Sequence, residues 1–251
     1  MRIGYLGVGT IAGCMIEGFC GLGTEHDFYL SPRNAAKSAA LSAKYANCIV
    51  CDSNQHVVDM ADTVIVSMLA DTCVETLKGL RFRRDQWIIN LVATIPPEDI
   101  LGAVGEVGDF AHIVPLPFIK HRLGPISAYP ENDALRELLS PLGSVVFARS
   151  MDEIRAMQAI TALMSPFYEM LHQLAIFAEG EGMPRAEAIA FISTFFASLG
   201  QRPLEGDFRH HALDMTPGGL NELTLKRLGQ SGAISAWAEV MTEVMGRIKK
   251  N

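Results

Sequence analysis

The sequence predicts an α/β fold: a doubly wound, mostly parallel sheet over residues 1–150, followed by an all-α part over residues 151–251. Three observations lead to this prediction. Apolar runs of strand length alternate with helical patterns up to residue 150, a glycine-rich turn joins the first run to the first helical pattern, and nearly every later segment has a helical pattern. Such alternation is typical of a parallel sheet with helices on both faces.

The elements of both parts can be placed in order. The expected strands are 2–6, 27–31, 48–51, 63–68, 87–92, 112–116, 126–129 and 144–148. The expected helices of the first part are 11–22, 35–45, 71–79 and 133–140, and those of the second are 152–178, 185–199, 217–228 and 233–249. Ser150 and Glu153 form a capping box at the start of the second part, while Pro184 and Pro217 suit first helical turns.

The turn after the first strand carries a chemical signal. It contains Gly7, Gly9, Thr10, Ile11 and Ala12, directly between the first strand and the first helix. Gly7 permits a tight turn, Gly9 lets the backbone approach a pyrophosphate, and the small Ala12 lets the helix pack close to the strand. The N–H groups and dipole at the helix start favour phosphate. The sequence therefore predicts a Rossmann-type dinucleotide-binding domain over residues 1–150.

The end of the second strand indicates which dinucleotide binds. NAD sites usually carry an acidic residue there, which bonds the ribose 2′-hydroxyl. This chain has Ser31, Arg33 and Asn34 instead. An arginine fork and small donors suit a 2′-phosphate, which a carboxylate would repel. We therefore expect NADP(H) as the cofactor, the alternative being an ordinary turn with a solvated arginine.

Composition excludes several classes of partner. The 251 residues are 49% hydrophobic and 20% charged, and the net charge of −7 argues against a nucleic-acid partner. The uncharged run 188–200 is too short to span a bilayer and is expected to be buried between helices. The first strand begins at Arg2, which leaves no room for a secretory signal, so we expect a cytoplasmic protein.

The cysteines are expected to be reduced and structural. The chain has five of them, an odd number. Cys48 and Cys51 have C-x-x-C spacing, but they lie in an expected strand without a second pair or a nearby histidine set. Packing is therefore favoured over redox or zinc chemistry, and no metal site is predicted.

Four pieces of the chain resemble the pyrroline-5-carboxylate reductase family, in the same order. They are 3–12 (the nucleotide turn), 31–34 (the NADPH-selective segment), 161–163 with 182–188, and 216–219 with 228–232. The resemblance implies an NADPH-dependent oxidoreductase that transfers hydride to a cyclic imine, as in proline biosynthesis. It also implies that residues 151–251 form an all-α dimerisation and substrate domain, and that the active form is at least a homodimer.

The chain departs from the family where substrate is expected. The family's glycine-rich turn, whose N–H groups hold the substrate carboxylate, is replaced by Met164-Ser165-Pro166. An anion nest is hard to form without glycine. The family's Lys-Pro after the fourth strand is replaced at Ser67-Met68-Leu69, of which Met68 and Leu69 are expected to contact the cofactor. The cationic cluster Lys120-His121-Arg122 is a possible substitute for the lost nest.

The resemblance also places the catalytic candidates. Asn221 corresponds to the family's threonine that contacts the substrate nitrogen, and together with Ser165 it is assigned a catalytic role. An amide can donate to a carbonyl or accept from an iminium N–H. The substrate-binding candidates are Pro166, Gly218, Gly219 and Glu222, the two glycines through N–H groups at a helix start that we expect at Pro217.

Other functions fit parts of the same pattern. The chain is compatible with an NADP-dependent reductase of a different imine or carbonyl substrate. A 3-hydroxyacid-type dehydrogenase is a further alternative, for which Lys226 is the nearest candidate lysine. A non-catalytic NADP-binding sensor would explain a preserved nucleotide turn beside an altered substrate turn.

Overall fold

The computed structural model describes residues 1–201 and 207–249. Two compact units make up the chain, one ending at Gln158 and the other beginning at Ala159. Each unit is described by itself below. The predicted division into an α/β part and a helical part is confirmed, whereas the assignment of separate roles to 1–150 and 151–251 stays a prediction.

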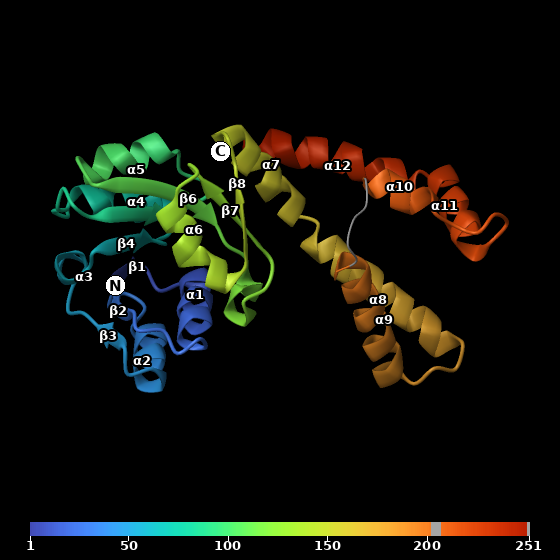
Figure 1. Cartoon of the computed structure of the whole chain (residues 1–251), viewed down its shortest axis with the longest axis horizontal. Coiled ribbons are helices and arrows are strands. Elements are labelled where there is room, and N and C mark those ends of the chain that lie inside the picture. Colours follow the sequence, from blue (N-terminus) through green and yellow to red (C-terminus); the bar gives the residue numbers. More distant parts are fainter. Residues whose placement is uncertain (202–206, 250–251) are drawn as a thin grey trace. The chain divides into compact units, whose positions relative to one another are not determined.

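The first unit contains an eight-stranded sheet with the strand order β3-β2-β1-β4-β5-β6-β7-β8 (Figure 1). The strands are β1 (Arg2–Leu6), β2 (Asp27–Leu30), β3 (Cys48–Val50), β4 (Thr63–Val66), β5 (Trp87–Asn90), β6 (Asp109–Val114), β7 (Pro125–Tyr129) and β8 (Ser144–Phe147). All neighbours are parallel except β6 and β7. Each lies at a predicted run, although β6 begins three residues early.

Helices cover both faces of this sheet (Figure 1). One face carries α1 (Thr10–Cys20), α2 (Ala35–Lys44) and α6 (Asp133–Leu139), with the 3₁₀ turns η1 (Pro117–His121) and η2 (Ser140–Leu142). The other carries α3 (Asn54–Met60), α4 (Ala70–Lys78) and α5 (Pro97–Val104). The short helices α3 and α5 were not predicted, although the equally short α6 was.

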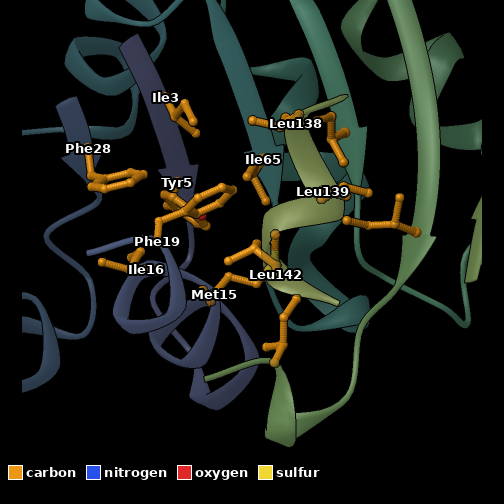
Figure 2. Close-up of a cluster of buried hydrophobic side chains, with 14 of the residues drawn as sticks. Ile3, Tyr5, Met15, Ile16, Phe19, Phe28, Ile65, Leu138, Leu139 and Leu142 are labelled. Carbon is orange, nitrogen blue, oxygen red and sulfur yellow. The ribbon is translucent and has the colours of Figure 1, made fainter. Parts of the chain in front are cut away.

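The larger core of the first unit lies between β1, β2, α1 and α6. Tyr5 and Phe28 are fully buried with their rings tilted at a centroid distance of 6.1 Å, and Phe19 packs against Phe28. Leu138 and Leu139 close the cluster from α6 (Figure 2). Each such side chain stabilises the fold by about 1.5–3 kcal/mol. This core fixes the start of α1, and therefore the glycine turn, against the sheet.

The second unit is entirely helical among its described residues. Its helices are α8 (Met164–Gly180), α9 (Arg185–Gln201), α10 (Phe208–Leu213), α11 (Leu220–Gln230) and α12 (Ala233–Ile248), and α7 (Met151–Thr161) joins the two units. Sequence analysis missed α10. It also predicted one helix over 152–178, whereas the chain turns at Ala162 and Leu163, whose N–H groups donate to the carbonyls of residues 159 and 160.

The start of α11 differs from the prediction. Pro217 precedes the helix, which begins at Leu220 with Gly219 as its N-cap. Gly218 has a φ of +71°, which is incompatible with a helical residue. Asn221 is therefore the second residue of α11 and lies closer to the start of the helix than expected.

Much apolar surface of the second unit is exposed. Phe177, Phe191 and Leu220 are 67%, 66% and 82% exposed. Run 188–200 forms most of α9, yet only Ala188 and Ile192 are buried there, so the described residues do not bury it between helices as predicted. No helix among the described residues is long and apolar enough to cross a membrane.

Candidate functional site

Hydrogen bonds from two neighbouring strand ends hold the glycine turn after β1. Gly7 has a φ of +95°, and a Cβ added there would lie 2.7 Å from the Ser67 carbonyl oxygen. The Gly7 N–H donates to Ser31 Oγ over 2.9 Å, and the Ser67 hydroxyl donates to the Gly7 carbonyl. Glycine is required here by both the backbone conformation and the close approach of β4.

The turn presents the start of α1 to open space. Gly9 is the N-cap and carries no side-chain cap, and a Cβ at this position would meet no described atom within 4 Å. The first N–H groups of a helix have no partner within the helix. Those of Thr10, Ile11 and Ala12 are thus donors at the positive end of the helix dipole, which suits a diphosphate. Ala12 is fully buried, consistent with its predicted packing role.

A cleft of about 340 Å³ lies beside this turn, within the first unit. It is lined by Gly7, Val8, Gly9, Arg33, Asn34, Ser67, Met68 and Leu69. The cleft occupies the carboxyl ends of β1, β2 and β4, where the strand order reverses and open α/β sheets bind ligands. Most of the predicted cofactor residues are therefore brought together, and no acidic side chain is among the described residues that line the cleft.

The polar residues of the predicted NADP segment differ in their surroundings: Ser31 and Asn34 support the glycine turn, and Arg33 is exposed. Ser31 is only 1% exposed, so its side chain supports the turn from within, and its expected contact with a phosphate stays a prediction. Its Oγ accepts from Gly7, as described above. Asn34 donates from Nδ2 to the Val8 carbonyl over 3.1 Å, which ties the segment to the glycine turn. Arg33 is exposed at the cleft and donates from Nη1 to Thr72 Oγ1 over 3.2 Å.

Sequence analysis missed a second cation beside the turn. Lys37, in the first turn of α2, donates from Nζ to Thr10 Oγ1 over 3.2 Å. Both residues line a pocket of about 290 Å³ next to the cleft. The sequence signal that could have indicated this second cation is the position of Lys37, four residues after Arg33. Two cations thus flank the start of α1.

The cluster Lys120-His121-Arg122 does not supply a free cationic site. Lys120 Nζ forms an ion pair with Glu17 at 2.9 Å, and Lys44 pairs with the same carboxylate at 2.8 Å. These two lysines lower the pKa of Glu17 by hydrogen bonding. Arg122 has a φ of +59° and donates to the Gly21 carbonyl. The predicted substitute for the carboxylate nest is thus engaged in structural contacts.

A buried polar pair joins the carboxyl end of β5 to the neighbouring residue within β6. Asn90 donates from Nδ2 to His112 Nδ1 over 2.9 Å, and its Oδ1 accepts from the Val92 N–H over 2.9 Å. Both side chains are fully buried, and burial lowers the pKa of His112 to about 4. His112 is therefore neutral at neutral pH. The pair fixes the first residues of the loop after β5, next to the β4 strand end.

The structure places the catalytic candidate Ser165 and the substrate-binding candidate Pro166 in the exposed first turn of α8. Leu163 is the N-cap, and Ser165 and Pro166 follow as the second and third residues. Pro166 has no N–H, and no glycine lies in this turn. This helix start therefore lacks one backbone donor, and the roles of Ser165 and Pro166 toward a substrate stay predictions.

The candidates at α11 are partly occupied by capping. Glu222 Oε2 accepts from the Gly218 N–H over 2.6 Å, and the Gly219 N–H donates to the Thr216 carbonyl over 3.0 Å. These N–H groups were expected to bind substrate but are already engaged. Asn221 is exposed at the same helix start. Of the α11 candidates, Asn221 is the side chain most open to a ligand.

An apolar groove of about 800 Å³ crosses the second unit. Its walls include Pro166 and Met170 of α8, Phe191 and Phe195 of α9, and Trp237 of α12. Pro166 thus contributes to this groove, which sequence analysis did not anticipate. The rings of Phe191 and Phe195 are stacked at 6.3 Å.

The cysteines behave as packing residues. All five are free. Burial raises the pKa of Cys48 to about 12 and that of Cys51 to about 11, so both thiols are protonated and poor nucleophiles. Among the described residues, no group of three or more His, Cys, Asp or Glu side chains could hold a metal ion.

Comparisons with known proteins agree with this geometry. Residues 2–94 match the family described as NADP oxidoreductase, coenzyme F420-dependent. No curated protein matches the chain.

Solved structures match over the whole length. The pyrroline-5-carboxylate reductase of Streptococcus pyogenes is 21% identical, with a TM-score of 0.84 and coverage of 100% of this chain and 99% of that one. The enzyme of Coxiella burnetii is 17% identical, with a TM-score of 0.83 and coverage of 99% and 97%. That of Plasmodium falciparum, with NADP bound, is 12% identical, with a TM-score of 0.82 and coverage of 100% and 97%.

The fold expected from the sequence resemblance is therefore confirmed. A reductive aminase from Aspergillus terreus matches less closely, with 16% identity, coverage of 99% and 92%, and a TM-score of 0.56. The chain has the fold of the pyrroline-5-carboxylate reductases, with a first part that matches the NADP oxidoreductase family.

Proposed function

We propose that this chain is an NADPH-dependent reductase that transfers hydride to the carbon of a cyclic imine, of the pyrroline-5-carboxylate type. The observation that carries the proposal is the fold shared over essentially the whole length with three pyrroline-5-carboxylate reductases, one with NADP bound. The cleft at the glycine turn adds independent support, because its chemistry suits a phosphorylated dinucleotide.

The chain's own residues fit NADPH. The N–H groups at the start of α1 bind the diphosphate, and the open space at Gly9 lets it approach the backbone. Arg33 and Lys37 bind the 2′-phosphate, where a carboxylate is missing. Ser31 and Asn34 keep the two segments in register. When bound, the cofactor supplies the hydride.

The second unit supplies the substrate contacts in this proposal. Asn221 accepts from the iminium N–H, which holds the protonated nitrogen in place, and Ser165 donates to a polar group of the substrate. Hydride transfer to an iminium carbon needs orientation and exclusion of water more than a strong protein acid or base. Glu222 acts by capping Gly218, which fixes the backbone beside Asn221.

A homodimer completes the second unit. Its groove and the side chains of Phe177, Phe191 and Leu220 expose more apolar surface than isolated domains usually carry. A second copy of the helical unit would cover this surface, because homo-oligomers commonly use the same patch on both subunits.

A comparison of three substrate classes tests the activity. NADPH oxidation is measured with pyrroline-5-carboxylate, with uncarboxylated 1-pyrroline and with 2-keto acids. Turnover of the first supports the proposal as stated, and Asn221→Ala should then lower kcat/KM by about 10- to 100-fold while NADPH affinity is kept. Asn221→Asp is the size-matched comparison.

Other outcomes would redirect the proposal. Turnover of 1-pyrroline alone would indicate that the carboxylate site is absent, in line with Pro166 and the engaged N–H groups of residues 218 and 219. Turnover of keto acids alone would favour the hydroxyacid dehydrogenase alternative. Tight NADPH binding without turnover of any of them would favour a sensor.

A further inference from the structure

A serine at the end of β4 is in direct contact with the glycine turn. Ser67 follows β4 and lines the cleft of about 340 Å³ beside that turn. Its hydroxyl donates to the Gly7 carbonyl. Its backbone N–H donates to the Leu6 carbonyl over 2.9 Å, which continues the pairing of β4 with β1 and fixes the backbone from which the hydroxyl extends. The proposed reductase reaction gives this side chain no role.

All three carbonyl groups of the turn, those of residues 7, 8 and 9, are engaged by donors. Ser67 covers the Gly7 carbonyl, and Asn34 Nδ2 covers the Val8 carbonyl over 3.1 Å. The third carbonyl accepts from a backbone N–H of α1 over 3.1 Å. Carbonyl oxygens carry the negative end of the peptide dipole, and N–H groups carry the positive end. The turn therefore offers free N–H groups at the start of α1 while the charge of its own carbonyls is compensated.

The Gly7 carbonyl is the one most able to turn away from its donor. A peptide unit is planar, so this carbonyl and the N–H of Val8 rotate together. Glycine permits the rotation because it has no Cβ, and Gly7 already has a φ of +95°. If the Ser67 hydroxyl is removed, the oxygen loses its compensating donor and is free to turn toward the cleft. Its partial negative charge would then repel a diphosphate.

Ser31 does not hold this carbonyl. Its Oγ accepts from the Gly7 N–H over 2.9 Å, and that N–H belongs to the preceding peptide unit. Ser31 is also buried, whereas Ser67 is partly exposed at the cleft. The two hydroxyls therefore hold two different peptide units of the same turn.

We propose that Ser67 is a positioning residue of the cofactor site, which acts through the Gly7 carbonyl. Its hydroxyl holds this carbonyl toward the end of β4 and offsets its partial negative charge, so that the turn admits a diphosphate. This role rests on the proposed binding of NADPH at the turn. Because NADPH and NADH share the diphosphate, Ser67 contributes equally to the binding of both and takes no part in recognition of the 2′-phosphate.

Calorimetric titration of Ser67→Ala with three ligands tests this role. NADPH carries the diphosphate and the 2′-phosphate, NADH carries only the diphosphate, and 2′-AMP carries only the 2′-phosphate. We expect NADPH and NADH to bind about 5- to 10-fold more weakly, as for one lost hydrogen bond, while the affinity for 2′-AMP stays within about twofold. Arg33→Ala should show a different pattern, with weaker binding of NADPH and 2′-AMP but not of NADH.

Two further variants separate positioning from stability. The Ser140 hydroxyl donates to the Arg136 carbonyl over 2.6 Å, outside the cleft, so Ser140→Ala removes the same kind of hydrogen bond. It should bind all three ligands like the native chain. Ser67→Cys keeps a side chain of similar size with a weaker donor, so its affinity for both dinucleotides should lie between those of Ser67→Ala and the native chain. Urea unfolding checks that each variant is folded under the titration conditions.

Two results would overturn the proposal. One is an unchanged affinity of Ser67→Ala for NADPH and NADH. The other is an equal loss for 2′-AMP and the dinucleotides, which would indicate a general disturbance of the cleft. The titrations contain no imine, so an absence of reductase turnover leaves them unaffected. A native chain that binds neither dinucleotide would overturn the NADPH proposal together with this one.

Discussion

The two units of the chain differ in how far each buries its own apolar residues. In the first unit, α1 alone buries Ala12, Met15, Ile16 and Phe19 against the sheet. In the second, α8 buries only Ala175, and α11 and α12 bury no residue among those described. The first unit therefore carries a core of its own, while the helices of the second unit present apolar faces that the described residues of that unit do not cover. We infer that stability of the second unit depends on assembly.

The largest effect expected from this difference is on assembly. Phe191→Asp places a charge on the apolar groove of α9. Because desolvating that charge is costly, we expect a dimer at least about 100-fold weaker and a corresponding loss of reductase activity. Light scattering after size-exclusion chromatography measures the subunit number.

The conservative Phe191→Leu should keep the dimer, since it keeps an apolar side chain. NADPH binding by the first unit should survive in both variants, as its cleft lies wholly within that unit. An unchanged dimer in Phe191→Asp would show that this groove is not the interface.

The second prediction separates two glycines of one turn. In Gly7→Ala the alanine has to adopt a positive φ, and its Cβ lies 2.7 Å from the Ser67 carbonyl oxygen. We therefore expect the unfolding free energy to fall by about 1–3 kcal/mol and NADPH binding to be lost. Gly9→Ala points into open space and should leave stability within about 0.5 kcal/mol.

The Gly9→Ala variant should differ from the native protein only in its affinity for NADPH. In Gly9→Ala the methyl group lies where the diphosphate approaches, so NADPH should bind about tenfold or more weakly. Urea unfolding and calorimetric titration measure the two quantities. If Gly9→Ala binds NADPH normally, the diphosphate does not lie at this turn.

The third prediction concerns cofactor choice. Arg33→Ala should raise the KM for NADPH by about 10- to 100-fold but leave that for NADH within about threefold, because only NADPH has the 2′-phosphate. Lys37→Ala should act in the same direction and more weakly. Thr72→Ala removes the hydroxyl that Arg33 contacts and is the matched control. Equal effects on both cofactors would contradict the assignment.

Features that depend on residues close together in the sequence could be predicted, whereas features that depend on packing between distant segments could not. The central strands such as β1 and β4 are buried and appear as continuous apolar runs. The partly exposed strands β3 and β8 could also be placed, because their short sequences are apolar as well. Gly7, Gly9 and Arg33 follow from motif spacing, which is local. The burial of Ser31 and the approach of Lys37 to Thr10 depend on the packing of α2 against the turn, which spacing does not encode.

In the second unit, prediction from sequence also failed for neighbouring residues. Pro217 suits a first helical turn by itself, but the positive φ of Gly218 delays the helix to Leu220. The sequence shows that Ser165 and Asn221 are polar side chains near helix starts. Whether both meet one substrate depends on how the helices assemble, so their joint role stays a prediction.

The last prediction tests the core of the first unit through pH. His112 is fully buried and neutral, with its pKa lowered from 6.5 to about 4. Between these values the unfolded chain binds a proton that the folded chain does not, so unfolding becomes more favourable as pH falls. The contribution is about 1–3 kcal/mol, lost from pH 6.5 downward.

His112→Phe isolates this contribution. It leaves Asn90 without its partner, so it should be less stable at neutral pH, yet its unfolding free energy should fall less steeply between pH 6.5 and 4. Urea unfolding at several pH values in this window gives both slopes. The other acid-sensitive groups, including His26, contribute equally to both proteins and cancel in the comparison. Identical slopes would mean that His112 takes up its proton over the same pH range in the folded and the unfolded chain, and that burial does not hold it neutral.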